Sequence, residues 1–538
     1  MILNLRKVGL LLVFLLNSKT LLTAQVQQFT VEVTDTASLF SMPAVHSYAL
    51  GQWDGKWIII GGRTNGLHGF TPPSGFQPNG VSSDIYIVDP ATDTKISENV
   101  YSAFSDTIMW DALQAAFYQF SQHDSMLYIT GGYGLLSDSA DNYTLPNLIA
   151  VNLKQLVNAM QNSQPVAGSF RILQDSVFRV CGGHMYRTDS MYHIVFGHDF
   201  SRSYSVNDTL GFFKQQYTCE VRSFKINDDG VNLSISDYSA IHDSANFHRR
   251  DYNLVPQIFP DGSTGQTAFS GVFQYFTRMP YLNTVNINDQ GYEVVNTFNQ
   301  NLSQYASAFM PVYNSADNKM STVFFGGMSL YTFDAVTNSL LADSLIPFVP
   351  TISKVVRNAD STMVEYVNPT EMPGLIGTNS LFIADSTTPM LQDGIIDLNA
   401  LPYGITRVGS IIGGINSDLP NVSSTPLFSY ASGFVFRVYL NKFVDTKVKE
   451  VSVKNDILNL IAYPNPTDNL INIEFEIPGN NFVTVTVYDS KGNLSDHVFS
   501  GKKDAGKHSF KWQAATAGMY FCKVQTDKYT KSIKVVVR

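Results

Sequence analysis

Short apolar runs that end in paired glycines are the main hydrophobic pattern of this 538-residue chain. In "WDGKWIIIGG" (53–62) and "HDSMLYITGG" (123–132) a turn containing Asp precedes the apolar run, and two glycines follow it. Runs this short, flanked by Asp and Gly turns, are typical of β-strands in hairpins and not of helices. The pattern predicts an all-β protein.

The same order of turn, apolar run and glycine pair recurs six times along the chain. Each copy is followed by another strand-like segment, such as 84–89 or 434–440. Repetition of one supersecondary unit predicts a repeat architecture. The other four copies are "TDSMYHIVFG" (188–197, with Phe196 in place of the first glycine), "PDGSTGQTAFSG" (260–271), "ADNKMSTVFFGG" (316–327) and "YGITRVGSIIGG" (403–414).

These units resemble the blades of kelch-type β-propellers, in which an apolar strand ends in Gly-Gly. The resemblance implies a six-bladed propeller over residues 29–445, with seven blades as the alternative count and with long insertions in the loops. We expect the glycines where the second strand of a blade passes close to its neighbours, because a side chain would clash there and a positive φ is needed.

The first residues predict an exported chain. Arg6 and Lys7 precede an apolar run at 8–16 that is too short to cross a bilayer, and a polar stretch ends near Ala24. This order is typical of a secretory signal peptide, which we place at residues 1–24. Because no later stretch is long and apolar enough, we expect no transmembrane segment after signal cleavage.

The C-terminal residues 457–538 follow a charged linker at 446–456 and alternate short strands with Pro, Asn and Gly turns, as a small Ig-like β-sandwich does. Four motifs stand out in this segment: "YPNP", "VYDSKG", "AGMYFCKV" and "KSIKVVVR", with Tyr463, Pro464, Asn465, Pro466, Asp489, Gly492, Gly518, Tyr520 and Lys534. With these motifs the segment resembles the type A C-terminal sorting domain of the type IX secretion system of Bacteroidetes. The resemblance implies that the translocon and sortase of that system are partners, and that the protein travels through the periplasm to the medium or the outer-membrane surface.

The charge of the chain argues against nucleic-acid binding, and its cysteine count argues against a fold held by disulfides. Before Asn455 the chain holds 26 Lys and Arg against 37 Asp and Glu, a balance of −11, so it lacks the basic face that nucleic-acid binding requires. Three cysteines cannot form a disulfide framework. We expect free thiols, with a Cys181–Cys219 bridge as the alternative, and a monomeric protein.

Two polar clusters are the candidates for binding a ligand. One precedes the fourth glycine unit, at the start of an expected innermost strand, and the other lies on the loop after the first glycine pair. Arginine suits such a site because its planar donors can hold a carboxylate or sugar hydroxyls. The alternatives are a structural Arg250–Asp251 pair and a solvated turn. The clusters consist of His248, Arg249, Arg250 and Asp251, and of Arg63, Asn65 and His68.

The remaining motifs give weaker signals for chemistry. His184 and His198 are weak metal candidates, but with His193 they lie on separate segments, so we expect no metal and no cofactor. The chain has no G-x-S-x-G elbow and no phosphate-binding Gly-Lys-Ser/Thr loop. A dense Asp-Ser/Thr pattern resembles the O-glycosylation sequon of exported Bacteroidetes proteins, with turn chemistry as the alternative. The acceptor candidates are Ser125, Ser139, Ser190 and Ser244.

Together these features predict a secreted or surface-attached kelch-like propeller that binds a glycan or a protein and is not an enzyme. The alternative is a carbohydrate-active enzyme on the same fold, similar to mutarotases or epimerases. A copper oxidase or a glycosidase is less favoured, since the oxidase would need a Cys bonded to Tyr beside further Tyr and His ligands, and paired carboxylates cannot be assigned.

Overall fold

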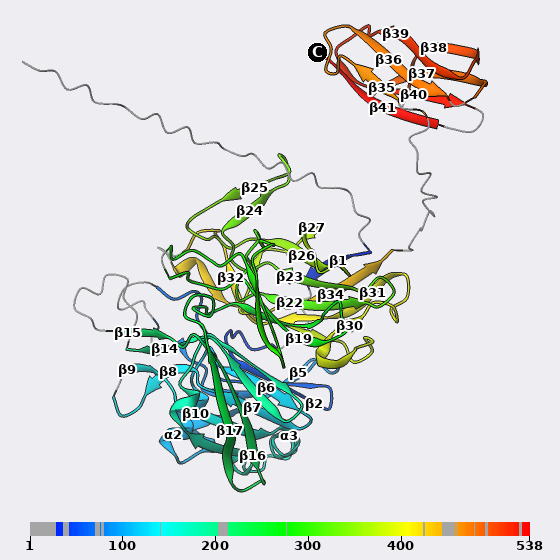
Figure 1. Cartoon of the computed structure of the whole chain (residues 1–538). Coiled ribbons are helices and arrows are strands. Elements are labelled where there is room, and N and C mark those ends of the chain that lie inside the picture. The colour runs from blue at the N-terminus through cyan, green and yellow to red at the C-terminus, as the bar shows by residue number, and fades with distance from the viewer. Residues whose placement is uncertain are drawn as a thin grey trace, which may run out of the picture. The chain divides into compact units, whose positions relative to one another are not determined.

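The computed structural model describes residues 28–35, 42–69, 76, 80–139, 141–202, 213–275, 277–422, 426–443, 458, 460–477, 479–489, 493–526 and 530–538. Its contacts divide the chain into two compact units, Met1–Val444 and Asp445–Arg538 (Figure 1). The expected signal peptide at 1–24 and linker at 446–456 lie outside the described residues. The fold is all-β, as the sequence predicts, with a few short helices.

Six antiparallel sheets repeat one plan in the described part of the first unit, with four strands side by side. In five of them the four strands follow chain order, and the sixth is completed by the first strand of the chain. The sheets are β2 (Ala49–Trp53), β3 (Lys56–Ile60), β4 (Asp84–Asp89) and β5 (Thr94–Asn99); β6 (Gln119–His123), β7 (Met126–Thr130), β10 (Asn147–Asn152) and β11 (Phe170–Gln174); β12 (His184–Thr188), β13 (Met191–Val195), β16 (Glu220–Asp228) and β17 (Leu233–His242); β18 (Asn253–Ile258), β19 (Thr264–Phe269), β20 (Thr284–Asn288) and β21 (Gly291–Val295); β22 (Ala308–Asn314), β23 (Lys319–Phe325), β26 (Thr351–Arg357) and β27 (Met363–Glu371), with the short β30 (Ile396–Asp397) beside β22; and β29 (Leu381–Ala384), β31 (Gly404–Ile412), β34 (Val435–Lys442) and β1 (Phe29–Asp35).

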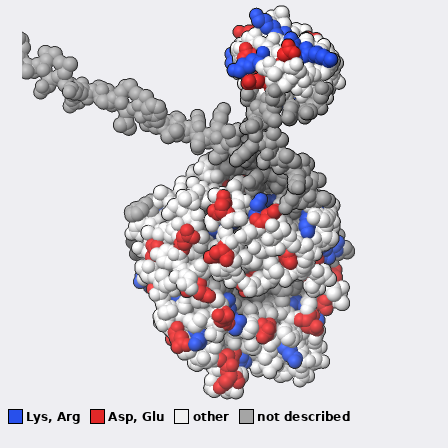
Figure 2. All heavy atoms as spheres, turned by 45° about the vertical axis from the view of Figure 1, so that its right-hand side comes forward, with Lys and Arg blue, Asp and Glu red and all other residues white. Residues whose placement is uncertain are grey.

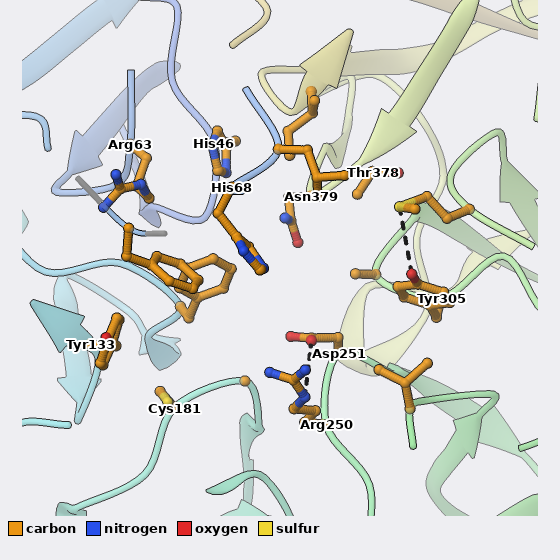
Figure 3. Close-up of a pocket in the computed structure, with 18 of the residues that line it drawn as sticks. His46, Arg63, His68, Tyr133, Cys181, Arg250, Asp251, Tyr305, Thr378 and Asn379 are labelled. Atoms are coloured by element: carbon orange, nitrogen blue, oxygen red, sulfur yellow. Dashed lines mark hydrogen bonds and ion pairs between the residues drawn. The ribbon is translucent and has the colours of Figure 1, made fainter. Parts of the chain in front are cut away.

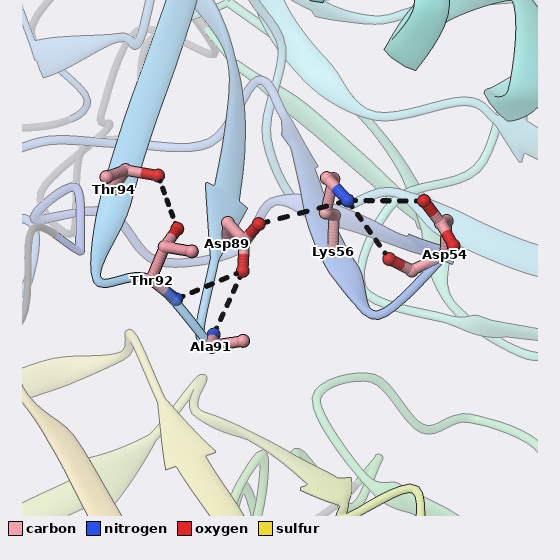
Figure 4. A network of polar contacts seen from close by, with 6 residues as sticks. All are labelled: Asp54, Lys56, Asp89, Ala91, Thr92 and Thr94. Carbon is pink, nitrogen blue, oxygen red and sulfur yellow. Dashed lines mark hydrogen bonds and ion pairs between the residues drawn. The ribbon is translucent and has the colours of Figure 1, made fainter.

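The hairpin turns explain the recurring Asp in the sequence. Asp54 has a φ of 51° and Asp124 a φ of 50°, in the left-handed region that tight hairpins need and Asp tolerates better than most residues. Side chains also fix the turns of the first sheet (Figure 4). Lys56 Nζ lies 3.3 Å from Asp54 Oδ2, and Asp89 Oδ1 accepts the Ala91 N–H at 2.9 Å.

The second strand of each sheet is buried because neighbouring sheets cover both of its faces. Ile58 and Ile60 of β3 share a core cluster with Leu127 of the second sheet. Ile59 points to the opposite face and shares a cluster with Ile412 of the sixth sheet. Strands buried on both faces carry continuous apolar runs instead of alternating ones, which is why the sequence shows runs before each glycine pair.

The sixth sheet joins the two ends of the first unit. Strand β1 pairs antiparallel with β34, from Phe29 opposite Lys442 to Asp35 opposite Phe436. Lys354 of β26 is buried beside this strand, donates from Nζ to the Phe29 carbonyl at 2.8 Å and lies 4.2 Å from the Phe29 ring. Both the strand pairing and this lysine hold the N-terminal strand in place.

Insertions follow the second strand of several sheets. Those of the second and third sheets combine into a further four-stranded sheet, and that of the fifth forms a hairpin. The insertion of the sixth sheet supplies two strands of a three-stranded sheet, whose remaining strand β28 precedes the first strand of the sixth sheet. Three α-helices lie between sheet strands in the described residues. These elements are β8 (Tyr133–Leu136), β9 (Asp141–Thr144), β14 (His198–Ser201) and β15 (Lys214–Tyr217); β24 (Tyr331–Asp334) and β25 (Ser339–Ala342); β28 (Leu375–Thr378), β32 (Ile415–Ser417) and β33 (Ser429–Ala431); and α1 (Val100–Ala103), α2 (Thr107–Leu113) and α3 (Leu153–Gln161).

The second unit has two sheets around one apolar core that includes Trp512 and Cys522. Acidic side chains are scattered over the visible surface of the first unit, whereas Lys and Arg gather on the visible face of the second (Figure 2). The sheets consist of β35 (Ile461–Tyr463), β36 (Leu470–Ile477) and β39 (Gly506–Gln513), and of β38 (Leu494–Lys503), β37 (Asn481–Asp489), β40 (Gly518–Thr526) and β41 (Thr530–Val537).

Candidate functional site

One cavity of about 140 Å³ is lined by residues from all six sheets of the first unit. Each sheet contributes through an antiparallel bridge between the residue after its glycine unit and a residue just before its first strand. Val272, Met328 and Ile415, for example, each follow a glycine and line the cavity. The six bridges are His46–Arg63, Ala116–Tyr133, Cys181–His198, Arg250–Val272, Tyr305–Met328 and Thr378–Ile415. We call this space the first cavity.

The glycine pairs let neighbouring sheets approach one another closely. A Cβ on Gly131 would lie 1.9 Å from the carbonyl oxygen of Val180 in the next sheet. The N–H of Gly132 donates to the same carbonyl at 3.0 Å. Both glycines have positive φ, 61° and 90°. Close approach and backbone conformation therefore both require glycine here.

A ring of six residues in the left-handed conformation lies at the first cavity, and five of the six line it. One residue from each sheet belongs to it, with φ between 48° and 65°. Backbone bonds connect the ring: Phe117 N–H donates to Ser47 at 2.9 Å and Asp251 N–H donates to Gly182 at 2.8 Å. We call this the left-handed ring; it comprises Ser47, Phe117, Gly182, Asp251, Ala306 and Asn379.

Two arginines from different sheets face the first cavity (Figure 3). Arg63, from the first sheet, is 3 % exposed and its Nε donates to Asn65 Oδ1 at 3.0 Å. Burial lowers the pKa of Arg63 to about 10, which leaves it protonated at neutral pH. Arg250, from the fourth sheet, has its Nε 3.7 Å from Asp251 Oδ2. With one carboxylate against two guanidinium groups, the cavity carries a net positive charge on an acidic body.

The histidines of the first cavity are neutral at physiological pH. Burial lowers the pKa of His46 to about 3 and that of His68 to about 4, and the nearby arginine charges add to both effects. Burial likewise raises the pKa of Asp251, although Arg250 opposes that shift. His68 stacks on Phe76 with ring centres 4.2 Å apart. Neutral imidazoles, aromatic rings and two cations thus share one small space.

The structure brings together four of the seven predicted ligand residues: Arg63, His68, Arg250 and Asp251 all line the first cavity. Asn65 supports Arg63 from behind through its hydrogen bond. His248 stacks on Tyr217 with centroids 3.6 Å apart and pairs with the Phe273 carbonyl.

Arg249 corrects the sequence interpretation, because its side chain is wholly buried. It donates to the carbonyls of Asn246 and Ser270 at 2.8 and 2.9 Å, and its guanidinium lies 4.0 Å from the Tyr281 ring centre. These partners belong to the protein interior, so Arg249 has a structural role.

The two weak metal candidates line different spaces. His198 lines the first cavity, with Nδ1 2.7 Å from Gln215 Nε2, whereas His184 lies on β12 with Nε2 2.7 Å from the Tyr252 carbonyl. Among the residues that the structure describes, no group of three or more His, Cys, Asp or Glu side chains could hold a metal ion.

Cys181, Cys219 and Cys522 are free and buried, so the alternative of a Cys181–Cys219 bridge is wrong. Cys181 lines the first cavity with Tyr133, and burial raises the pKa of its thiol to about 12. The thiol is therefore protonated and a poor nucleophile.

Sequence reasoning missed several lining residues, among them His46, Tyr133, Cys181, Tyr305 and Thr378. Their signal lies in the repeat itself. The residue directly after each glycine pair, and its bridge partner before the first strand, occupy equivalent places in every sheet.

The glycosylation candidates differ in exposure. Ser139, Ser190 and Ser244 are exposed, and Ser125 is half-buried in its hairpin turn. Asp124 and Asp189 next to them have left-handed φ, so turn chemistry accounts for the Asp-Ser pairs at these two sites.

One of the sorting-motif residues, Asn465, is hydrogen-bonded to the last strand of the second unit. Asn465 Nδ2 donates to the Lys534 carbonyl at 2.7 Å, and Asn465 Oδ1 accepts the Val536 N–H at 3.0 Å. Tyr520 packs edge-on against Trp512. Asp489 accepts the Asn493 N–H at 2.9 Å, whereas Gly492 lies outside the described residues. The others are Tyr463, which bonds Glu474 through its hydroxyl, and Pro464, Pro466 and Gly518.

Residues 461–538 match the family model described as a secretion system C-terminal sorting domain. This match supports export by the type IX secretion system, with its machinery as a partner and the medium or the cell surface as destination. Within the described residues no helix is long and apolar enough to cross a membrane.

No curated protein is significantly similar to the chain. A solved structure titled "Structure of YjhT" is 10% identical, with a TM-score of 0.39 over 71% of this chain and 95% of that one. A likeness of this size carries no argument about function.

Proposed function

We propose that this protein is an exported, kelch-like, six-bladed β-propeller that binds a carboxylate-bearing glycan in its first cavity. The six repeated sheets support the blade count, as does the packing of β3 between the second and sixth sheets. The sorting domain supports the destination, where glycans of other cells and of the medium are the accessible ligands. The resemblance of the C-terminal segment to the sorting domain also supports an origin in the Bacteroidetes.

The placement of Arg63 and Arg250 in one cavity carries this proposal. They come from the first and fourth sheets, and both lower the pKa of His68 through their charge. Guanidinium groups hold carboxylates with paired, charge-assisted hydrogen bonds. The aromatic side chains Phe117 and Phe273 line the same cavity and add apolar surface for a sugar ring.

An array of acidic glycans, neutral glycans and acidic peptides tests the proposal with the purified mature protein. We expect binding to uronic-acid-bearing glycans, competed by free glucuronate. Capture of acidic peptides alone would show a protein ligand instead, and no binding to any acidic member would refute the proposal.

A mutarotase-like enzyme is the second candidate, favoured by Asp251 and His68. Burial raises the pKa of Asp251 and keeps His68 neutral, so a carboxyl group and an imidazole, two kinds of side chain that general acid–base catalysis uses, line the same cavity. Such an enzyme would speed the exchange between the two anomers of an acidic sugar. NMR exchange measurements on wild type and Asp251→Asn test this; equal exchange rates with and without protein would exclude it for the sugar used.

A further inference from the structure

A second cavity of about 680 Å³ lies along the first strands of the six sheets, and no function has yet been assigned to it. Its lining includes residues of β2, β6, β12, β18, β22 and β29. Five members of the left-handed ring line both cavities: Phe117, Gly182, Asp251, Ala306 and Asn379. The ring therefore separates a small first cavity from a larger second one.

The lining of the second cavity is rich in side-chain amides. Amide groups both donate and accept hydrogen bonds, which matches the mixed donor and acceptor character of sugar hydroxyls. Hydroxyl groups of Ser121, Ser307 and Ser380 lie among them. The amide-bearing residues are Gln52, Gln119, Gln122, Asn253, Gln266 and Asn379. Two of these amides are already paired within the protein through both nitrogen and oxygen: that of Asn253 with the Gln304 carbonyl and the Ser307 N–H, and that of Gln122 with the Gln52 backbone and the Asp124 carbonyl.

Aromatic rings accompany these polar groups. Phe120, Phe309 and Phe382 come from the second, fifth and sixth sheets and line the same space. Flat apolar faces beside planar amides are the combination that packs against a sugar ring while its hydroxyls are hydrogen-bonded.

The charge of the second cavity differs from that of the first. Its lining residues with Asp, Glu, Lys or Arg side chains are Arg187, Asp251 and Asp393. The histidines His123 and His184 also line it, and burial lowers the pKa of His184. The first cavity has two arginines, Arg63 and Arg250, and one carboxylate, whereas the second cavity has one arginine and two carboxylates among its lining residues. The second cavity therefore suits an uncharged ligand, whereas the first suits an anion.

We propose that the second cavity is a separate binding site for a neutral oligosaccharide. The volume of the second cavity is several times that of the first cavity, so the second cavity has room for more than one sugar unit. This site stands on its own lining and does not require that the first cavity bind an acidic glycan.

The test uses an array of neutral gluco-, manno-, galacto- and xylo-oligosaccharides with the mature full chain. Ser121→Trp places a large ring in the second cavity from the half-buried β6, and Gln52→Leu removes an amide at an exposed position. Thr92→Trp, on an exposed turn outside both cavities, is the matched control. All variants are first checked for wild-type thermal unfolding.

We expect neutral oligosaccharides to bind wild type and Thr92→Trp equally, and Ser121→Trp at least about tenfold more weakly. Gln52→Leu, which leaves the fold intact, should weaken binding by about three- to tenfold. Absence of any neutral ligand, or binding unchanged in both cavity variants, would overturn the proposal. Binding of acidic glycans should be unchanged in Ser121→Trp. The experiment therefore distinguishes a failure of the second-cavity proposal from a failure of the proposal that the first cavity binds an acidic glycan.

Discussion

The backbone N–H of Gly414 donates a hydrogen bond of 3.1 Å to the carbonyl oxygen of Val45, which joins the sixth sheet directly to the first. The equivalent bond from Gly62 to Ala115 joins the first sheet to the second at 2.8 Å. The glycine pairs are thus junctions between neighbouring sheets. The residue that follows each pair is the one that reaches the first cavity.

Replacing a junction glycine should be far more damaging than replacing a turn glycine. A Cβ on Gly326 would lie 1.9 Å from the Ile376 carbonyl oxygen, and its φ is +58°. We expect Gly326→Ala to lower the free energy of unfolding by about 3 kcal/mol or more, because backbone must move. Urea unfolding measures this.

Gly230→Ala is the matched control for backbone conformation. Gly230 has a φ of +89°, but a Cβ added to it would meet no atom within 4 Å. Only conformational strain remains, and we expect a loss of about 1 kcal/mol. Equal losses at the two positions would contradict the assignment of the glycine pairs as close sheet junctions.

The buried Lys354 predicts that stability rises with pH above neutrality. Burial lowers its pKa in the folded state from 10.5 to about 7. Between these values the unfolded chain holds a proton that the folded chain has lost. The free energy of unfolding should therefore increase by about 1.4 kcal/mol per pH unit between pH 7 and 9 from this group. In Lys354→Met that increment should disappear; an unchanged slope would show that the ammonium group is not desolvated.

The buried His46 of the first cavity should make the protein less stable at acid pH. His46 has its pKa lowered from 6.5 to about 3 by burial, so the unfolded chain takes up a proton below pH 6.5 while the folded chain does not. Stability should fall by about 1.4 kcal/mol per pH unit between pH 6 and 4 from this group. Urea unfolding of His46→Gln should show a slope smaller by about that amount. Equal slopes would mean that His46 is accessible to protons in the folded state.

The sorting unit should depend on Asn465 for the attachment of its last strand. Asn465→Ala removes both hydrogen bonds to β41 and should lower the stability of this unit by about 1–3 kcal/mol. We expect less protein in the culture supernatant. Gln525→Ala, an exposed change on the neighbouring β40, is the control and should leave secretion unchanged. If both variants were secreted normally, the hydrogen bonds of Asn465 would not be needed for export.

The sequence predicts the strands well because runs buried between two sheets and Asp turns are local signals. It also places Arg63, His68 and Arg250 at the cavity, since they stand beside glycine pairs or first strands. It could not tell Arg249 from Arg250, because adjacent residues point to opposite sides and only the packing against Tyr281 shows which side is interior. Nor could it find the second cavity, whose amides come from several sheets far apart in the chain.

Binding in the first cavity is decided by calorimetric titration of an acidic glycan, the strongest binder on the array, into wild type, Arg250→Gln and Arg179→Gln. Arg179 is exposed and does not line the first cavity, so its substitution removes the same charge from the same unit. We predict that Arg250→Gln weakens binding about tenfold to a hundredfold, through loss of a charge-assisted hydrogen bond, while Arg179→Gln binds like wild type. Equal affinities of the two variants would contradict the first cavity as the binding site.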